Sequence, residues 1–232
     1  MPVEPSPDIP MVDAQPTPFT RTRGLDRDRH AAGFPAARRV GETLGNDVGQ
    51  LAAVVPPLQE LLAAARSAGL LIIHTREGHR PDLTDLPAAK YRRGKPSLRI
   101  GDPGPYGRIL IRGEYGHDII DELAPLPGEA VIDKPGKGAF YATELQAVLD
   151  EHEITNLVVT GVTTEVCVHT TVREANDRGY EVLVPADCVG SYFPEFQRVG
   201  LDMVAAQGGI FGWVSDSATL IAQLRQPAAT AA

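Results

Sequence analysis

Residues 156–185 read NLVVTGVTTEVCVHTTVREANDRGYEVLVP, and this stretch decides the fold. An apolar run ends at Gly161, residues 163–179 have helical spacing and end on a glycine, and residues 181–185 are apolar again. Such an order is typical of a strand, a crossover helix and a second, parallel strand. The stretch therefore predicts one β-α-β unit of a parallel sheet.

The same alternation extends along the chain on both sides of this unit. We expect helices at residues 54–68, 142–150, 194–206 and 216–225, and strands at residues 70–75 and 130–133. Repeated β-α units of this length predict a mostly parallel sheet with helices on both faces.

The composition limits the classes of partner. The 232 residues include 22 Lys and Arg against 30 Asp and Glu, which gives a formal net charge of -8. An acidic chain has no basic field to attract phosphates, so we expect neither nucleic acid nor a membrane as a partner. No apolar stretch approaches the roughly 20 residues that span a bilayer, and the opening MPVEPSPDIP has no signal-peptide pattern. We therefore expect a cytoplasmic protein.

The chain divides into an arm, a main domain and a tail. Residues 1–19 hold six of the 20 prolines and no periodic apolar pattern, which predicts an irregular arm. The first region, residues 1–41, joins this arm to a segment at about residues 20–40, and it is followed by the main domain at residues 42–225 and a disordered tail at residues 226–232. Residues 76–107 are rich in Gly, Pro and charged residues, and a connection this long predicts a wall or lid over a site.

Two chemically useful residues directly follow predicted strands. Lys134 comes after the strand at residues 130–133, and Cys167 lies at the start of a helix, just beyond the Gly161 turn. Ligands bind such sheets outside the carboxyl ends of the strands. A helix N-terminus favours a thiolate and a developing oxyanion, and a nearby lysine would add to that effect. The alternative is an inert, buried Cys167 and an exposed Lys134.

The residues around these positions resemble the isochorismatase-like cysteine hydrolases. Residues 134–140 read KPGKGAF and residues 161–168 read GVTTEVCV, which fits the family pattern G-V-x-T-x-x-C-V. The resemblance implies a three-layer, doubly wound (Rossmann-like) sandwich, an Asp-Lys-Cys triad and a homo-oligomer. Four further stretches are similar to the branch that hydrolyses biuret, triuret and ureidoacrylate, namely residues 74–83, 100–114, 171–181 and 207–218.

The resemblance also implies roles for individual residues. Cys167 would be the nucleophile and Lys134 the cation that stabilises its thiolate. The backbone N–H groups of Thr163 and Cys167 would form the oxyanion hole, next to a cis peptide bond between Val162 and Thr163. Tyr192 and Gln207 are expected to contact the substrate, although Gln207 has the alternative role of a helix-end residue that bonds nearby backbone.

The Asp of the triad is missing from its expected place. The family has D-M-Q-x-D-F at the end of the first strand, whereas residues 20–40 carry six Arg and two Asp. With permitted codons, residues 29–40 shifted by one base encode Asp-Met-Gln-Arg-Asp-Phe-Leu-Gln-Pro-Gly-Gly. We therefore expect a compensated frameshift over about residues 20–40. The alternative is a lineage that lost the Asp, with Asp26 or Asp28 in its place.

As written, residues 20–40 are expected to stay outside the sheet and leave a gap at its centre. The reason is that a central parallel strand is buried on both faces, and an unpaired Arg there costs several kcal/mol. A poorly folded, inactive chain would follow.

The implied activity is hydrolysis of a C–N bond in a small ureide, through an acyl-enzyme on Cys167, with release of ammonia or an amine. The alternatives are an inactive homologue and an amidase for another small amide, such as nicotinamide. No metal or other cofactor is required. His74, Glu77, His79 and Asp82 could suggest a metal cluster, but their spacing matches no familiar ligand pattern.

Overall fold

The computed structural model describes residues 30–34 and 48–226. Its centre is a parallel six-stranded sheet with the order β10-β8-β6-β1-β2-β5. The strands are β1 (His30–Phe34), β2 (Leu71–Glu77), β5 (Ala130–Lys134), β6 (Asn156–Val159), β8 (Glu181–Pro185) and β10 (Trp213–Ser215). The prediction of a mostly parallel sheet is confirmed.

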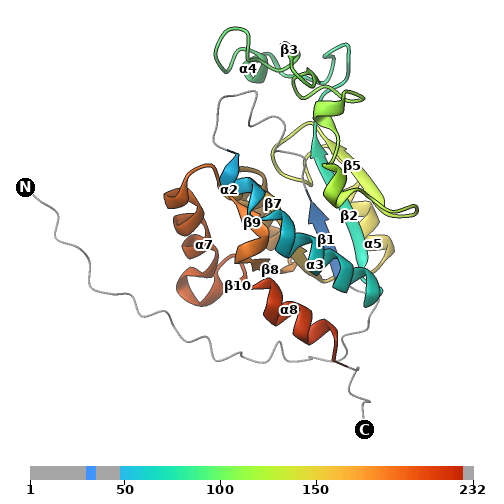
Figure 1. Ribbon diagram of the computed structural model, residues 1–232, viewed down its shortest axis with the longest axis vertical. Coiled ribbons are helices and arrows are strands. Elements are labelled where there is room, and N and C mark those ends of the chain that lie inside the picture. The colour runs from blue at the N-terminus through green and yellow to red at the C-terminus, as the bar shows by residue number, and fades with distance from the viewer. Residues whose placement is uncertain (1–29, 35–47, 227–232) are drawn as a thin grey trace, which may run out of the picture.

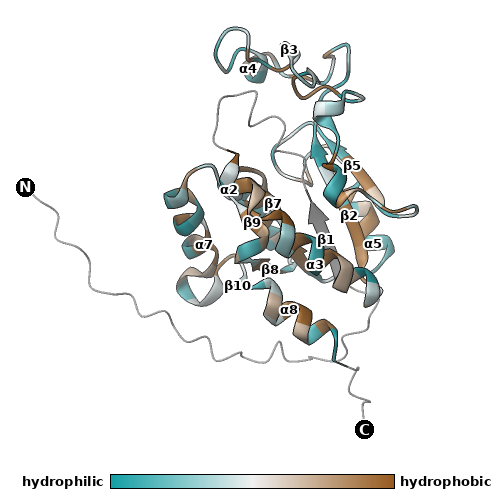
Figure 2. Ribbon diagram, viewed as in Figure 1, coloured by the Kyte–Doolittle hydropathy of each residue, from teal (hydrophilic) through white to brown (hydrophobic). Residues whose placement is uncertain are grey.

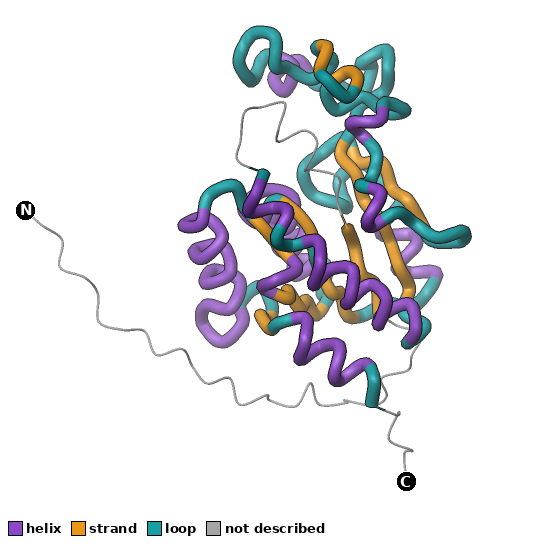
Figure 3. The backbone as a smooth tube through the Cα atoms, viewed as in Figure 1, coloured by secondary structure: helices purple, strands orange, loops and turns teal. Residues whose placement is uncertain are grey.

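Helices cover both faces of this sheet (Figures 1 and 3). One layer holds α3 (Val55–Ser67) and α8 (Ser217–Leu224), with the short α2 (Gly49–Ala52) before α3. The other layer holds α5 (Leu145–Glu151), α6 (His169–Asp177) and α7 (Pro194–Gly209). The expected three-layer α/β sandwich is therefore present. None of the helices within residues 48–226 is long and apolar enough to cross a membrane.

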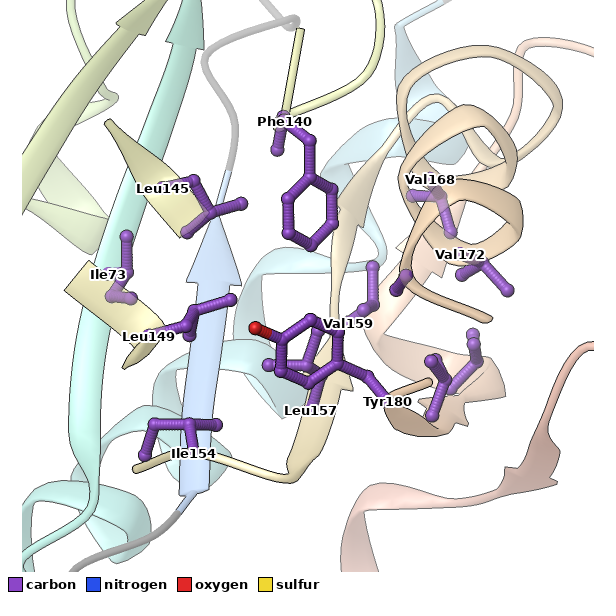
Figure 4. Close-up of a cluster of buried hydrophobic side chains, with 14 of the residues drawn as sticks. Ile73, Phe140, Leu145, Leu149, Ile154, Leu157, Val159, Val168, Val172 and Tyr180 are labelled. Carbon is purple, nitrogen blue, oxygen red and sulfur yellow. The ribbon is translucent and has the colours of Figure 1, made fainter. Parts of the chain in front are cut away.

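Two apolar cores fix these layers to the sheet. On the α5–α6 face, Leu149 and Val172 pack with Val159 of the sheet, and the ring of Phe140 stacks on Tyr180 (Figure 4). On the other face, Leu58 of α3 packs with residues of α8 and the sheet. Figure 2 shows apolar residues along β5 and on parts of α3 and α8.

The strand order reverses beside β1. From β1 the chain runs outward through β2 to β5, and it then returns to β6 on the other side of β1 and runs outward through β8 to β10. A doubly wound sheet opens a crevice at such a reversal, at the carboxyl ends of its strands. The chain segments that follow β5 and β6 are therefore placed to build a site.

The position of β1 corrects one expectation. Residues 30–34 were expected outside the sheet, but they pair in parallel with β2 on one side and β6 on the other. The expected gap at the centre of the sheet is therefore wrong. The reason lies in the local sequence, because HAAGF contains none of the six arginines of residues 20–40. The backbone of these five residues can therefore pair even though arginines precede and follow them in the sequence. Asp26 and Asp28 lie outside the described residues.

A long insertion separates β2 from β5. It contains α4 (Ala88–Tyr91), the short antiparallel pair β3 (Pro103–Gly104) and β4 (Gly107–Arg108), and the 3-10 turns η1 (Tyr115–His117) and η2 (Asp121–Leu123). In Figure 1, α4 and β3 lie beyond the carboxyl ends of β2 and β5. The insertion thus occupies the edge of the sheet where the expected wall or lid belongs.

Candidate active site

Cys167 lies on a turn between the sheet and α6. After β6 the chain forms β7 (Gly161–Val162), which pairs with β9 (Val189–Gly190), and then the π-helical turn η3 (Thr164–Val168) that leads into α6. The peptide bond between Val162 and Thr163 is cis, as expected. Single π-helical turns within α-helices are frequent at functional sites. Here the turn leaves Cys167 half-buried at the carboxyl edge of the sheet.

Lys134 and Cys167 come together at this edge. The Nζ of Lys134 donates to the Sγ of Cys167 at 3.4 Å. Lys134 ends β5 and Cys167 follows β6, and these two strands are not neighbours in the sheet. Nζ also donates to the carbonyls of Gly136 at 3.3 Å and Lys137 at 2.8 Å. An ammonium group has three hydrogens, and three acceptors account for all of them. The Lys134 side chain is only 1% exposed, so water does not screen its charge.

A carboxylate that the sequence analysis did not assign to catalysis completes this group. Glu77 is the last residue of β2, and its Oε2 lies 4.0 Å from the Sγ of Cys167. Its Oε1 accepts from Lys90 at 2.8 Å and from Lys137 at 2.9 Å. Burial alone would raise the pKa of Glu77, but the ammonium groups of Lys137, Lys134 and Lys90 hold it below the ordinary value. Glu77 is therefore ionised at neutral pH.

Tyr192 lies close enough to Glu165 and Cys167 to interact with both electrostatically. It is half-buried, and its pKa is raised to about 12, mainly by burial and also by the negative charge of Glu165. A tyrosine with so high a pKa keeps its hydroxyl proton at neutral pH and can donate it to a carbonyl oxygen. Contact of Tyr192 with a substrate stays a prediction.

Thr163 is buried at the start of the π-helical turn. Its carbonyl accepts from the backbone N–H groups of Val166 at 3.1 Å and Val168 at 3.3 Å. Gln197 of α7, which the sequence analysis missed, bonds the hydroxyl of Thr164 and donates to the carbonyls of Ala186 and Val189. Gln197 therefore ties the turn that carries the thiol to α7 and β9.

Gln207 corrects another expectation. It was expected to face the cavity beside Cys167, but it is exposed and lies near the end of α7, with a left-handed φ of 54°. The chain enters β10 only a few residues later, and the start of a parallel strand lies at the amino edge of the sheet. Cys167 lies at the carboxyl edge. A helix that returns the chain across the sheet therefore carries Gln207 away from the site.

A cavity of about 50 Å³ lies beside the Lys134–Cys167 pair. Thr75 and Ile73 of β2 and Val159 of β6 are among its lining residues, so it reaches inward from the carboxyl edge. One water molecule needs about 10–15 Å³ of such volume. The cavity therefore has room for a group of a few heavy atoms.

The residues that suggested a metal cluster have separate partners. His74 pairs with Glu129 at 2.9 Å and His79 with Asp85 at 3.2 Å, while Glu77 is held by lysines. Within the described part of the chain, no three His, Cys, Asp or Glu residues gather as metal ligands. The Nε2 of His169 donates to the carbonyl of Gly200 in α7 at 2.7 Å, and its Nδ1 accepts from Arg173 of its own helix at 3.2 Å, so these contacts of His169 are structural.

Comparison with known proteins identifies the family. The model of the isochorismatase domain matches residues 35–219. A cysteine hydrolase from Pseudomonas syringae pv. phaseolicola 1448A is 26% identical, with a TM-score of 0.72 over 86% of this chain and 94% of that one. An isochorismatase family protein from Burkholderia thailandensis is 25% identical, with a TM-score of 0.68 over 87% of this chain and 98% of that one.

The fold is shared with more distant proteins as well. An N-carbamoylsarcosine amidase from Thermoplasma acidophilum is 22% identical, with a TM-score of 0.61 over 82% of this chain and 96% of its own length. At this identity the similarity establishes the fold alone.

Proposed function

The chain belongs to the isochorismatase family of hydrolases, and from that premise we propose that it is a cysteine-dependent amidohydrolase of small ureides. The observation that carries the proposal is the contact of 3.4 Å between Lys134 and Cys167 at the carboxyl edge of the sheet. A buried cation on the sulfur stabilises a thiolate, which is the reactive form of a cysteine nucleophile. An inert structural cysteine would need neither the cation nor its half-exposed position.

The first half of the reaction forms an acyl-enzyme. The Cys167 thiolate attacks the carbonyl carbon, a C–S bond forms, and the carbonyl electron pair moves to oxygen. The backbone N–H groups of Thr163 and Cys167 donate to this oxyanion, and such donors act on charge that develops in the transition state. The C–N bond then breaks, and the protonated nitrogen leaves as ammonia or an amine.

The second half regenerates the thiol. Water attacks the thioester-like carbonyl, the C–S bond breaks, and the acid product leaves. Tyr192 supports the choice of substrate, since its protonated hydroxyl can donate to a second carbonyl of the kind that a ureide carries. The small cavity also favours a compact substrate over a bulky one.

Ammonia release tests this proposal. The purified protein is given biuret, triuret, ureidoacrylate and nicotinamide in separate assays, and we expect turnover of at least one ureide. Cys167→Ala should remove nearly all of it, whereas Cys188→Ala should not. Cys188 is buried, and this burial is the main reason why its pKa is raised to about 12. Cys188 therefore provides no thiolate at neutral pH.

Two other outcomes would point to the rival functions. Turnover of nicotinamide without ureides would identify an amidase for simple amides. Absence of ammonia from every substrate, with slow labelling of Cys167 by iodoacetamide, would identify an inactive homologue. Equal labelling rates of Cys167 and Cys188, read by peptide mass spectrometry, would contradict the covalent mechanism.

A further inference from the structure

The Cys167 thiol needs a proton acceptor before it can attack. Lys134 cannot fill this role, because its three hydrogens already have three acceptors and its nitrogen has no lone pair to offer. The family's acid is expected at the end of the first strand, and the written sequence has no such motif there. Another carboxylate is therefore required.

Glu77 has the geometry of that acceptor. The sulfur of Cys167 receives the Lys134 ammonium at 3.4 Å and directs its own hydrogen toward the Oε2 of Glu77 at 4.0 Å. Oε1 of Glu77 accepts from two lysines, Lys90 and Lys137, whereas Oε2 accepts from only one of them, Lys137, at 3.0 Å. The oxygen that faces the sulfur is thus the less occupied of the two. Catalytic hydrogen bonds are often long before substrate binds and shorten in the complex.

Resting on the proposed amidohydrolase function, we propose that Glu77 is a catalytic residue that takes the Cys167 proton and delivers it to the leaving nitrogen. In the first step the S–H bond breaks, an O–H bond forms on Glu77, and the sulfur pair attacks the carbonyl carbon. As the C–N bond breaks, the nitrogen takes the proton from Glu77. Glu77 then accepts a proton from the attacking water and returns it to the sulfur when the C–S bond breaks.

The charges around Glu77 fit this role. The groups that face it are the ammonium groups of Lys90 from α4, Lys134 from β5 and Lys137 from the following turn, the Cys167 thiol from η3, and His79 next to β2. Three cations accompany one carboxylate, so the cluster can hold a second negative charge on the sulfur after the proton has moved. Only 9% of the Glu77 side chain is exposed, which shields the transfer from bulk water.

The test compares Glu77→Gln with the wild type and with Glu174→Gln as a matched control. Glu174 is a partly exposed glutamate on α6 that also pairs with a basic residue, Arg178, at 2.7 Å. Two quantities are measured: the rate of ammonia release, and the pH profile of Cys167 alkylation by iodoacetamide. The second needs no substrate and reports the proton on sulfur directly.

We expect Glu77→Gln to lower ammonia release about 100-fold or more, as is usual when a general base is lost. Its alkylation profile should shift to lower pH, because the thiolate then faces the lysines without a competing carboxylate. Glu77→Asp should recover part of the turnover, and Glu174→Gln should match the wild type in both measurements.

Two outcomes would overturn the proposal, and a third separates it from the proposed function. Turnover of Glu77→Gln within a few-fold of the wild type would overturn it, since the acid would then lie elsewhere, for example at Asp26 or Asp28. Lost turnover with an unchanged alkylation profile would also overturn it, because Glu77 would then act on structure alone. If the wild type releases no ammonia, the proposed function fails, and the alkylation profile by itself decides whether Glu77 shares the thiol proton.

Discussion

Burial sets the charge state of individual side chains in this protein, and His117 is an example. It is 1% exposed, and a Cβ on Gly78 would lie 2.3 Å from its ring. Burial lowers its pKa to about 4, and the cations of Arg76 and Arg112 act in the same direction. His117 is therefore neutral in the folded protein at every pH above about 4.

This histidine should destabilise the fold in mild acid. Unfolded His117 binds a proton near pH 6.5 but the folded residue does so only near pH 4, so its stabilisation is complete above pH 6.5 and declines below it. The decline should reach about 2 kcal/mol at pH 5. We expect urea unfolding of His117→Gln to show a smaller loss of stability between pH 7 and pH 5 than the wild type.

His152 provides the control for this measurement. It is exposed and bonds only the carbonyl of Val148 among the contacts that the structure shows for it. His152→Gln should keep the wild-type difference between pH 7 and pH 5. The same difference in His117→Gln would contradict the assignment, and would leave His74 and His79, whose pKa values burial also lowers, as the source.

At the level of elements, Lys90 is one of the side chains that attach the insertion between β2 and β5 to the site. Lys90 of α4 donates to the Oε1 of Glu77 at 2.8 Å and to the carbonyl of Pro135 at 2.6 Å. The first contact reaches the end of β2 and the second the turn after β5. Lys90 thus links the insertion to the two strand ends that carry Glu77 and Lys134.

Lys90→Met should loosen this link while it keeps the length of the side chain. We expect faster limited proteolysis within residues 78–118 and a higher KM, because the wall of the site would be less ordered. Lys95→Met is a suitable control, since Lys95 is an exposed lysine of the same insertion. Identical proteolysis of Lys90→Met and Lys95→Met would contradict a fastening role for Lys90.

Regular elements could be predicted where the chain carries a clear apolar period. Residues 181–185 became β8 with the expected bounds, and the helix expected at residues 54–68 became α3. Residues 30–34 lacked such a signal, because Ala and Gly are poor strand formers and give no apolar run. Pairing with β2 and β6, which lie far along the chain, makes this segment a strand.

The site was partly predictable for the same reason. Cys167 and Lys134 follow strands and carry family motifs, so the sequence indicated both. Glu77 lies 90 residues from Cys167, and only the pairing of β1 with both neighbours brings them to one edge. Gln207 was misplaced because sequence spacing does not reveal the edge of the sheet at which a helix ends.

The whole chain offers a test of its first strand. We propose that the sequence of about residues 20–40 results from a compensated frameshift. In the unshifted reading frame, this segment would place an Asp at the end of the first strand. A chain in which residues 25–40 are replaced by the shifted-frame sequence, with Ser-Ile-Ala-Ile as the apolar strand followed by Asp-Met-Gln-Arg-Asp-Phe-Leu-Gln-Pro-Gly-Gly-Phe, should release ammonia from a ureide faster than the written chain. The gain should be in kcat, since a second carboxylate would assist proton transfer.

The measurement is made on both chains under the same conditions, with thermal unfolding as a check on folding. Equal kcat in the two chains would contradict the frameshift proposal. Genomic reads that confirm the written frame, together with ureide hydrolysis by the written chain, would do the same.

The strand β1 also has a consequence for the distance between the reacting groups. It separates two halves of the sheet: Glu77 and Lys134 end strands of one half, and Cys167 follows a strand of the other. Adjacent strands lie about 4.8 Å apart. The width of β1 between the two halves therefore helps to set the distance between the Sγ of Cys167 and the Nζ of Lys134. A substitution that interrupts the backbone pairing of residues 30–34, such as a proline, should therefore change the reactivity of Cys167 by changing the spacing of the two halves.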